Sequence, residues 1–561
     1  MTLEPLRRWT IRLAAPMLLV VIVVLPRLCA AAFVITPARD MVRYVEAAEF
    51  LRTLPLGDAV RSMDCHPLYP AALLAVRTVL SQTLGLSGPT SWVAAGESLG
   101  VGCYVLFILT AFAVGTRLWD RRAAFWGCAI AALLPRQISY TVDVLTDSLH
   151  AWLWMTCVWF LSSVDRPKPT LSLAFAGLVA GFAYWTRSEA ILLPAMALLG
   201  GLIIQIFPAW RLPRRQAIAG AAAFAVCWAV PVGAYVSTIG RLSPRNTVAA
   251  FTGASGVVEP GAGAPATRHD GAETPARTEA SIVSNVQAAL SVAPPQLTPR
   301  PYVGDEAYEF RPLSLAIVAF GYEVAQETRV WMLPFATWGL FLSGPTLRKR
   351  SSVFLTFAWL GYTAMLTLLQ VKCGYIAGRY LMPLMPMLGI STAIGVRAFI
   401  ERAATMSSRF GESISAGLAP RRARQGALLA VVLAALGTSA PAWFRSNHRF
   451  RQTYLDAAEW LKTHTQPGEA VFDPVCLVSF YADRPNWKPT EQPKTIPVRY
   501  GVIDLERVYR TDGLSHLVIR SFGQLGRPVA EFRQHKSNRQ GVVYIYELPV
   551  STAQMPREGI R

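Results

Sequence analysis

The position of Asp40 is the strongest chemical signal in the chain. This aspartate follows the first apolar segment almost immediately and opens the stretch 41–54, whose apolar residues recur with helical spacing along one face. That pattern is typical of a helix lying in the membrane interface. A carboxylate held at this depth could act as a general base. A simpler interpretation is that Asp40 caps the helix at its start, because Asp is a preferred N-cap residue.

A second group of charged residues borders later apolar segments. Asp143 and Asp147 are four residues apart, so on a single helix they would share one face. Arg187 and Glu189 lie in a very short turn between two apolar runs. Charged residues at membrane depth are costly and are often functional. The simpler interpretations are a pair of solvated acids at a helix start and a structural ion pair.

The remaining candidates could bind an anion or a substrate. Lys372, Arg379 and Tyr380 precede a proline-containing apolar run. Arg binds phosphate through a bidentate fork and Lys acts as a point charge, although both side chains could simply extend to the membrane interface. His66 and Tyr69 lie in the segment H-P-L-Y-P. They are weaker candidates for substrate contacts, because a plain turn explains them as well.

The composition identifies the class of protein that must position these residues. Of the 561 residues, 53% are hydrophobic and 16% are charged, and the mean hydropathy is +0.34. A soluble protein is usually less apolar and carries more charge. We therefore predict a polytopic α-helical membrane protein with about 11 spanning helices, each needing roughly 20 apolar residues. They lie at roughly 11–36, 92–117, 122–136, 146–163, 170–186, 189–209, 216–238, 328–344, 351–370, 380–400 and 425–445.

The chain has 54 basic against 35 acidic residues, an excess that could indicate nucleic-acid binding or membrane topology. The basic clusters fall in alternate loops, which is the pattern of the positive-inside rule, so we expect no nucleic-acid partner. With every cluster in the cytoplasm, the C-terminal tail lies outside the cell inner (plasma) membrane. Asp40 and the loops at about 37–91 and 239–327 share that outer face. The clusters are Arg7-Arg8, Arg117 to Arg122, Arg166 to Lys168, Arg211 to Arg215, Arg348 to Arg350 and Arg421 to Arg424.

Two domains are expected. Residues 1–445 form the membrane domain, and residues 446–561 form a small extracytoplasmic α/β domain, because helical and strand-like patterns alternate in the tail. The tail contains a helix-like segment at 454–461 and strand-like runs at 470–472, 516–519 and 542–546. Residues 251–300 are rich in Gly, Ala, Pro, Ser and Thr without an apolar period, which predicts a mobile loop.

The eight cysteines indicate no metal site. The chain contains no CxxC, HExxH or nucleotide-binding motif. Most cysteines fall in apolar segments, where a thiol behaves as a small hydrophobic group. Of those expected outside, Cys65 and Cys373 could form a disulfide.

Several of these features also resemble a known family in their order along the chain. They are Asp40 just after the first span, His66 to Pro70 closing the first loop, Asp147 entering the fourth span, Gly177 to Glu189 ending in T-R-S-E, and Arg379-Tyr380 with the prolines that follow. Together they resemble the GT-C membrane glycosyltransferases, in the branch of the protein O-mannosyltransferases and the lipid A aminoarabinose transferase. The resemblance covers the membrane part, and the tail resembles outer domains of bacterial members more loosely.

The resemblance implies an inverting transferase that moves a sugar from a polyprenyl-phosphate donor to a protein, lipid or glycan acceptor. Asp40 would be the general base, with Asp147 or Asp143 as the second catalytic acid. The donor phosphate would be bound by Arg379, Lys372, Arg187 and Tyr380, and substrate by His66, Tyr69 and Glu189. The family often has two adjacent acids in the first loop, whereas this chain has Arg39-Asp40. No cofactor follows from the sequence, and use of a divalent cation stays open.

Two other classes of protein would also be polytopic. A transporter of a lipid or an anionic solute should carry its charges near mid-span and show a repeat relating its halves. The acids named above lie at outer ends instead, and the sequence shows no such repeat. A non-catalytic membrane scaffold would bind a partner through its outer domain, and Asp40 would then be dispensable.

Overall fold

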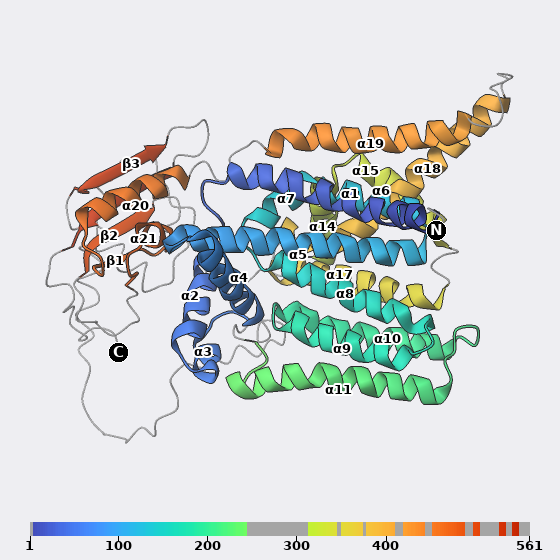
Figure 1. Cartoon of the computed structure of the whole chain (residues 1–561), viewed down its shortest axis with the longest axis horizontal. Helices are drawn as coiled ribbons and strands as arrows, with labels where there is room; N and C mark the ends of the chain where they lie inside the picture. Colours follow the sequence, from blue (N-terminus) through green and yellow to red (C-terminus); the bar gives the residue numbers. More distant parts are fainter. Residues whose placement is uncertain are drawn as a thin grey trace. The chain divides into compact units, whose positions relative to one another are not determined.

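The computed structural model divides the chain into two compact units (Figure 1). Unit 1 comprises Met1–Arg245 and Tyr308–Asn447, and unit 2 comprises Asn246–Ala307 and His448–Arg561. The structure describes residues 4–243, 312–344, 349–373, 377–409, 419–443, 451–487, 498–504, 527–534 and 541–548. The segments predicted as a mobile loop (251–300) and as a strand (516–519) lie outside the described residues.

Unit 1 is helical. Its long helices lie side by side, and the short helices α2, α3 and α4 gather at one end of the bundle (Figure 1). The elements are α1 Glu4–Ala32, α2 Asp40–Thr53, α3 Leu56–Ser62, α4 Leu68–Leu84, α5 Gly88–Leu118, α6 Arg121–Ala132, α7 Pro135–Val142, α8 Asp147–Leu161, η1 Ser162–Asp165, α9 Pro169–Tyr184, η2 Ser188–Ile191, α10 Leu192–Ile206, α11 Arg214–Ile239, α14 Leu313–Thr328, α15 Met332–Leu342, α17 Arg350–Cys373, η3 Gly378–Leu384, α18 Met385–Arg409 and α19 Ala419–Trp443.

Among the described residues, six helical segments are long and apolar enough to cross a membrane, so the chain is a multi-pass membrane protein. They are Leu13–Ala32, Gly88–Leu118, Ser188–Ile206, Arg214–Ile239, Arg350–Lys372 and Gly378–Ala403. Three shorter apolar helices lie at Pro169–Tyr184, Met332–Leu342 and Leu429–Pro441. The predicted number of about 11 crossings therefore stays a prediction.

Two boundaries differ from the sequence-based assignment. The predicted span 122–136 ends earlier, as the 12-residue α6, because Pro135 starts a separate helix, α7. Helix α14 occupies residues 313–328, the end of the predicted outer loop 239–327. Its second half carries Glu323 and Glu327, which lower the apolar signal of that segment.

Residues from some of the predicted basic clusters lie close together near the end of α8. Arg117 donates a hydrogen bond to Ser163 Oγ at 2.5 Å, and Lys349 Nζ donates to the carbonyl of Leu118 at 3.4 Å. Asp147 begins α8 at the helix end away from Ser163. These basic residues and Asp147 thus lie at opposite ends of α8. The assignment of the two membrane faces stays a prediction.

Two glycines of α5 let the segment between α7 and α8 pack closely against that helix. A Cβ atom on Gly96 would lie 2.1 Å from Val144, and one on Gly100 would lie 2.2 Å from the Thr141 carbonyl. Val144 has a φ of +56°, an unfavourable conformation for a β-branched residue. The chain therefore turns sharply at this point.

This turn separates the two acids that were expected on one helix. Asp143 is the C-cap of α7, and Asp147 is the first residue of α8. The prediction that both lie on one helical face is wrong, because the left-handed residue Val144 breaks the helix between them.

Arg27 braces the same region from α1. Its side chain is fully buried and donates to the carbonyls of Val23 and Ala132 at 2.9 and 3.1 Å and to Thr141 Oγ1 at 3.3 Å. The guanidinium also lies 3.9 Å from the centre of the Tyr104 ring. A buried charge persists only when it is hydrogen-bonded or paired, so this arginine fixes α1 against α5, α6 and α7.

Unit 2 is a small sheet with two helices. Strand β1 pairs with β2 in parallel, and the other pairs are antiparallel, in the order β1-β2-β4-β3. Phe472, Ile503 and Leu548 contribute to its core. The helix and the two strand-like runs predicted within the described part of the tail are confirmed. The elements are α20 Gln452–His464, β1 Ala470–Phe472, α21 Leu477–Ala482, β2 Val498–Asp504, β3 Ala530–Gln534 and β4 Gly541–Glu547.

Cys65 carries a free thiol. In the described part of the chain, the disulfide to Cys373 considered above is therefore not formed.

The close packing at Gly100 yields a test of the fold. Gly100→Ala should lower the free energy of unfolding by about 1–3 kcal/mol, because the new methyl group would overlap a backbone carbonyl that cannot move freely. Gly102→Ala, on the same helix with open space around it, is the matched control and should be neutral. Thermal unfolding in detergent measures both, and equal melting temperatures for the two variants would contradict the packing described here.

Candidate active site

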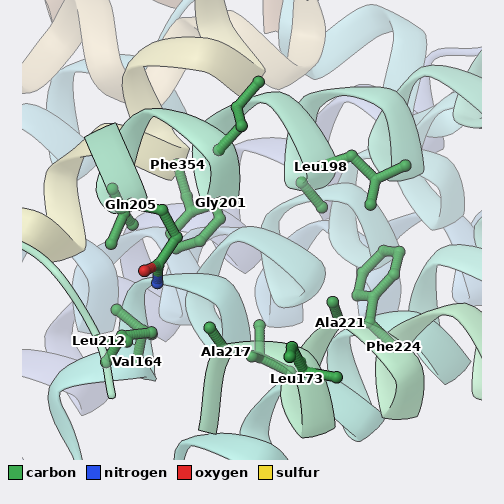
Figure 2. A pocket seen from close by; sticks show the side chains of 14 residues that line it. Val164, Leu173, Leu198, Gly201, Gln205, Leu212, Ala217, Ala221, Phe224 and Phe354 are labelled. Atoms are coloured by element: carbon green, nitrogen blue, oxygen red, sulfur yellow. The ribbon is translucent and has the colours of Figure 1, made fainter. Parts of the chain in front are cut away.

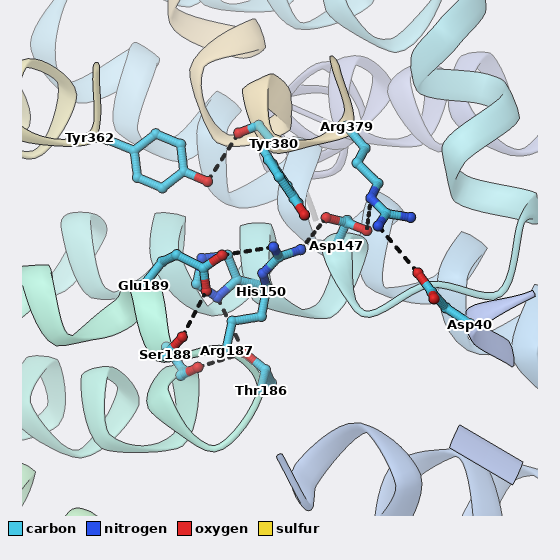
Figure 3. Close-up of polar contacts among 11 residues, drawn as sticks. Asp40, Asp147, His150, Thr186, Arg187, Ser188, Glu189, Tyr362, Arg379 and Tyr380 are labelled. Carbon is cyan, nitrogen blue, oxygen red and sulfur yellow. Dashed lines mark hydrogen bonds and ion pairs between the residues drawn. The ribbon is translucent and has the colours of Figure 1, made fainter. Parts of the chain in front are cut away.

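Four of the predicted site residues converge from the starts of four different elements (Figure 3). Asp40 is the first residue of α2 and Asp147 is the first residue of α8. Arg187 immediately precedes η2, and Arg379 is the second residue of η3. Residues 40, 147, 187 and 379 are far apart in the sequence, so only the helix packing brings them together.

Their side chains form a row of alternating charges. Arg379 Nη2 donates to Asp40 Oδ2 at 3.2 Å, and Arg379 Nε lies 3.9 Å from Asp147 Oδ2. Arg187 Nη1 donates to the other oxygen of Asp147, and Arg187 Nη2 donates to Glu189 Oε1 at 2.8 Å. The order is thus Asp40, Arg379, Asp147, Arg187 and Glu189.

Tyr380 lies against both arginines. The guanidinium carbons of Arg187 and Arg379 lie 4.5 and 5.5 Å from the centre of its ring. This is the range of cation–π attraction. Tyr362 on α17 donates a hydrogen bond from its hydroxyl to the Tyr380 carbonyl at 3.0 Å. The backbone of η3 is therefore held in place next to Arg379.

Exposure of the side chains is lowest at Asp147, in the middle of the row, and rises towards both ends. Asp147 is 4% exposed, Arg187 15%, Glu189 24%, Arg379 25% and Asp40 35%. Burial alone would lower the pKa of Arg187, but the charges of Glu189 and Asp147 outweigh that effect and raise its pKa well above the usual value. A molecule from outside can therefore reach Asp40 and Arg379, while Asp147 and Arg187 form the buried inner part of the site.

Asp40 does not cap its helix. The N-cap position of α2 is Arg39, and no side chain caps that end. The capping interpretation of Asp40 is therefore wrong, and its carboxylate faces Arg379 instead. Asp40 and Asp147 still benefit from the helices that they begin, because the N-terminal end of a helix carries partial positive charge that favours a carboxylate.

Asp143 contributes through its backbone. Its carbonyl accepts a hydrogen bond from the Ala38 amide at 3.1 Å, two residues before Asp40. Its own side chain is buried and interacts electrostatically with Glu97 on α5. Asp143 thus anchors the segment that carries Asp40 and lies outside the row of charges.

His66 is buried among aromatic rings. Its ring centre lies 5.5 Å from that of Tyr184 and 5.4 Å from that of Tyr235, and neither ring nitrogen has a hydrogen-bond partner among the described residues. Burial lowers the pKa of His66 to about 4. The following segment is joined to the T-R-S-E turn, because the Leu68 amide donates to the Trp185 carbonyl at 3.0 Å.

Tyr69 lies beneath α2. Its ring packs edge-to-face on Tyr44 at 4.9 Å, and its buried hydroxyl has no hydrogen-bond partner in the part of the chain that the structure describes. Burial raises the pKa of the Tyr44 hydroxyl well above its usual range, and the charges of Asp40 and Asp147 add to that effect. Lys372 lies in the last turn of α17 and is partly buried. Direct substrate contacts of His66, Tyr69 and Lys372 stay predictions.

Sequence reasoning missed His150 and Thr186, which support the buried inner part of the site. Thr186 Oγ1 donates to the Ala183 carbonyl, so it accepts from His150 Nδ1, 3.2 Å away. His150 is one helical turn beyond Asp147 on α8, a buried polar residue in an otherwise apolar helix. That spacing was the available signal. Tyr44 lies in the stretch 41–54 and was not predicted as a site residue either, although its hydroxyl interacts electrostatically with Asp40, Asp147 and Arg187.

The residues present do not form a metal site. Among the described residues, no group of three or more His, Cys, Asp or Glu side chains is arranged to hold a metal ion. Asp40, Asp147 and Glu189 each face an arginine instead. No chemical step is therefore assigned to a metal here.

A cavity of about 320 Å³ lies elsewhere in the bundle (Figure 2). It is lined by apolar residues of α9, α10, α11 and α17, with Gln205 as the polar exception. Its α10 residues lie between Ala197 and Gln205, at least two helical turns beyond Glu189. This cavity is therefore separate from the row of charges.

Comparison with known proteins agrees with this architecture. The model of a family described as dolichyl-phosphate-mannose-protein mannosyltransferase matches residues 74–235. The structure of ArnT from Cupriavidus metallidurans bound to undecaprenyl phosphate superposes with a TM-score of 0.57, at 13% identity over 94% of this chain and 97% of that chain. The fold is that of the GT-C glycosyltransferases. The resemblance inferred from the sequence is thereby confirmed.

Other solved GT-C structures are similar as well. The apo oligosaccharyltransferase of Archaeoglobus fulgidus gives a TM-score of 0.51 at 12% identity, covering 88% of this chain and 70% of that chain. The AglB structure from the same organism, in complex with an inhibitory peptide and a dolichol-phosphate, gives 0.50 at 13% identity, covering 99% and 76%. A search of the curated proteins found no match. At these identities the structural similarity establishes the GT-C fold alone.

The burial of His66 predicts a pH dependence of stability. Its pKa is about 4 in the folded protein against an ordinary value of 6.5, so between these values only the unfolded chain binds the extra proton. Stability should be unaffected by His66 above about pH 6.5 and should fall towards pH 4, by at most about 1.4 kcal/mol per pH unit. Thermal unfolding in detergent between pH 4 and 8 measures this. His66→Phe should flatten the profile, and the exposed control His464→Phe should not; unchanged profiles for both would contradict the assignment.

Proposed function

We propose that this protein is a glycosyltransferase that moves a sugar from a polyprenyl-phosphate donor to an acceptor hydroxyl, at the outer face of the inner (plasma) membrane. The observation that carries the proposal is the convergence of a partly exposed carboxylate, Asp40, with a partly exposed arginine, Arg379, next to a buried Asp147–Arg187 pair. The ArnT and AglB structures are described with undecaprenyl phosphate and dolichol-phosphate, which supports a lipid-linked donor.

Arg379 is the residue best placed to bind the donor phosphate. It is partly exposed and borders Asp40. A guanidinium can hold two phosphate oxygens at once. Arg187 and Tyr380 lie behind it, and Lys372 is assigned as a further positive charge. A phosphate leaving group needs charge stabilisation more than protonation, and preorganised donors supply that stabilisation efficiently.

Asp40 is assigned as the general base. Its carboxylate takes the proton of the acceptor hydroxyl while that oxygen attacks the anomeric carbon from the side opposite the phosphate. The bond from the anomeric carbon to the phosphate oxygen breaks, and its electron pair stays on the polyprenyl phosphate. The sugar is transferred with inversion. The nearby carboxylate also stabilises the positive charge that develops on the sugar in an oxocarbenium-like transition state.

Asp147 is reassigned from a second catalytic acid to a positioning residue. Both of its oxygens face arginines, and it is 4% exposed, so it orients Arg187 and Arg379 for the phosphate. Glu189 holds Arg187 from the other side. Contacts of His66, Tyr69 and Glu189 with the sugar or the acceptor complete the proposed site, and Asp143 supports it through its backbone.

The location of the charges favours an enzyme over a transporter. A transporter should bind its substrate near the middle of its spans. Asp40, Asp147, Arg187 and Arg379 instead lie at the starts of helices or in the segments just before them. They therefore form a site at one end of the bundle.

The first test is the loss of transfer on neutralising Asp40. Asp40→Asn should lower the transfer rate by roughly 10²–10⁴-fold, because the amide cannot accept the acceptor proton. The assay is transfer from a panel of radiolabelled polyprenyl-phosphate sugars in membranes containing the protein.

Asp58→Asn is the matched control, because Asp58 is an exposed acid on α3 paired only with Arg61 in the part of the chain described. It should transfer sugar like the wild type. Undiminished transfer by Asp40→Asn would overturn the assignment of the base, and wild-type transfer from none of the donors would count against the proposed function.

The second test separates the phosphate role from the base role. Arg379→Lys keeps the positive charge but loses the bidentate fork. It should raise the KM for the donor by about tenfold or more, a cost of roughly 1.4 kcal/mol, and leave the KM for the acceptor nearly unchanged. Steady-state kinetics with each substrate varied in turn measures this. An increase confined to the acceptor KM would contradict the assignment.

A further inference from the structure

A buried carboxylate lies behind η3, outside the row of charges. Glu327, near the end of α14, has a side chain that is 0% exposed. Its Oε1 accepts from Arg136 Nη1 at 3.0 Å and from the Tyr140 hydroxyl at 3.1 Å, and its Oε2 accepts from Gln137 Nε2 at 3.2 Å. All three donors come from α7. Glu327 therefore fixes α14 to α7 through a satisfied polar cluster.

The same carboxylate meets the backbone of η3. A Cβ atom on Gly378 would lie 1.9 Å from Glu327 Oε1 and 2.9 Å from the Tyr140 hydroxyl. Only a glycine fits at this position, and its neighbour in the chain is Arg379. The position of the Glu327 carboxylate therefore limits where the backbone next to Arg379 can lie.

Helix α7 connects the cluster to the other partner of the ion pair. Its C-cap is Asp143, whose carbonyl binds the Ala38 amide at 3.1 Å, two residues before Asp40. Glu327 thus contacts both structures that set the Arg379–Asp40 distance: η3 on one side and α7 on the other.

The backbone after Glu327 is strained in a way that suits this role. Arg329 has a φ of +61°, in the left-handed region that non-glycine residues rarely adopt. Strained backbone persists where the surrounding structure determines it, and it is concentrated at functional sites. Here it ends α14 immediately after Glu327 and Thr328, both of which are buried.

We propose that Glu327 is a positioning residue that holds Arg379 in register with Asp40. The inference rests on the proposed function, in which Arg379 binds the donor phosphate and Asp40 is the base. Glu327 acts through Gly378 and α7 and touches neither substrate. Replacing it by Gln keeps the shape but removes the charge that binds Arg136 and turns one acceptor into a donor, so Gly378 and α7 lose their common support.

The test is a double-mutant cycle between Glu327→Gln and Arg379→Ala. Glu327→Gln should raise the KM for the donor about tenfold, with a smaller effect on kcat, and the double variant should be within about twofold of Arg379→Ala alone, because coupled residues are not additive. Glu323→Gln is the control. It removes a partly exposed acid from the same helix that also faces Arg136, at 3.6 Å, and should behave as wild type.

Additive effects of the two substitutions, or wild-type kinetics of Glu327→Gln, would overturn the inference. A second measurement does not depend on transfer. In Arg379→Cys, the rate at which a thiol reagent modifies residue 379, followed by mass spectrometry, should change at least about threefold when Glu327→Gln is added, and not with Glu323→Gln. An unchanged rate would also overturn it. If the wild type transfers no sugar, the proposed function fails, while the thiol reaction still decides whether Glu327 positions residue 379.

Discussion

The site depends on one buried carboxylate, Asp147. It lies at the start of α8, 4% exposed, with one oxygen bound by Arg187 and the other facing Arg379. Removing one partner of a buried ion pair typically costs about 3–5 kcal/mol, because the other charge is left uncompensated. The two arginines are therefore held where they are by the carboxylate between them. Asp40 and Glu189 lie at the two ends of the row, so it contains three carboxylates and two arginines.

The packing of the helices supplies the geometry that this carboxylate needs. Gly96 and Gly100 on α5 admit the turn at Val144, and that turn sets the direction in which α8 begins. Arg27 holds α7 through Thr141 and α6 through the carbonyl of Ala132. Gly96, Gly100 and Arg27 are located on membrane helices, whereas the charged residues of the site lie at helix ends. The apolar bundle thus acts as a rigid frame for a polar site at its edge.

The sequence indicated the members of the site better than their roles. Asp40, Asp147, Arg187 and Arg379 stood out because a charge beside an apolar run is costly and visible in a short window. Their pairing was not predictable, because residues 40 and 379 meet only through the tertiary fold. The four-residue spacing of Asp143 and Asp147 predicted one helical face for both. That prediction is wrong because Val144, between them, has a left-handed backbone conformation that interrupts the helix. Glu327 gave no signal, because its partners on α7 are about 190 residues away in the sequence.

The gradient of exposure implies an order of events in the proposed reaction. Arg187 is held by both Asp147 and Glu189, so releasing it would leave Glu189 without its arginine and the buried Asp147 with Arg379 alone. Arg379 has a more exposed contact, to Asp40 at 3.2 Å, which an incoming phosphate can replace because it offers the guanidinium another anion. When the phosphate takes that place, Asp40 Oδ2 loses its arginine and becomes free to accept a hydrogen bond from the acceptor hydroxyl. Binding of the donor therefore frees Asp40 to act as the general base. In the protein without bound donor, Asp40 stays paired with Arg379.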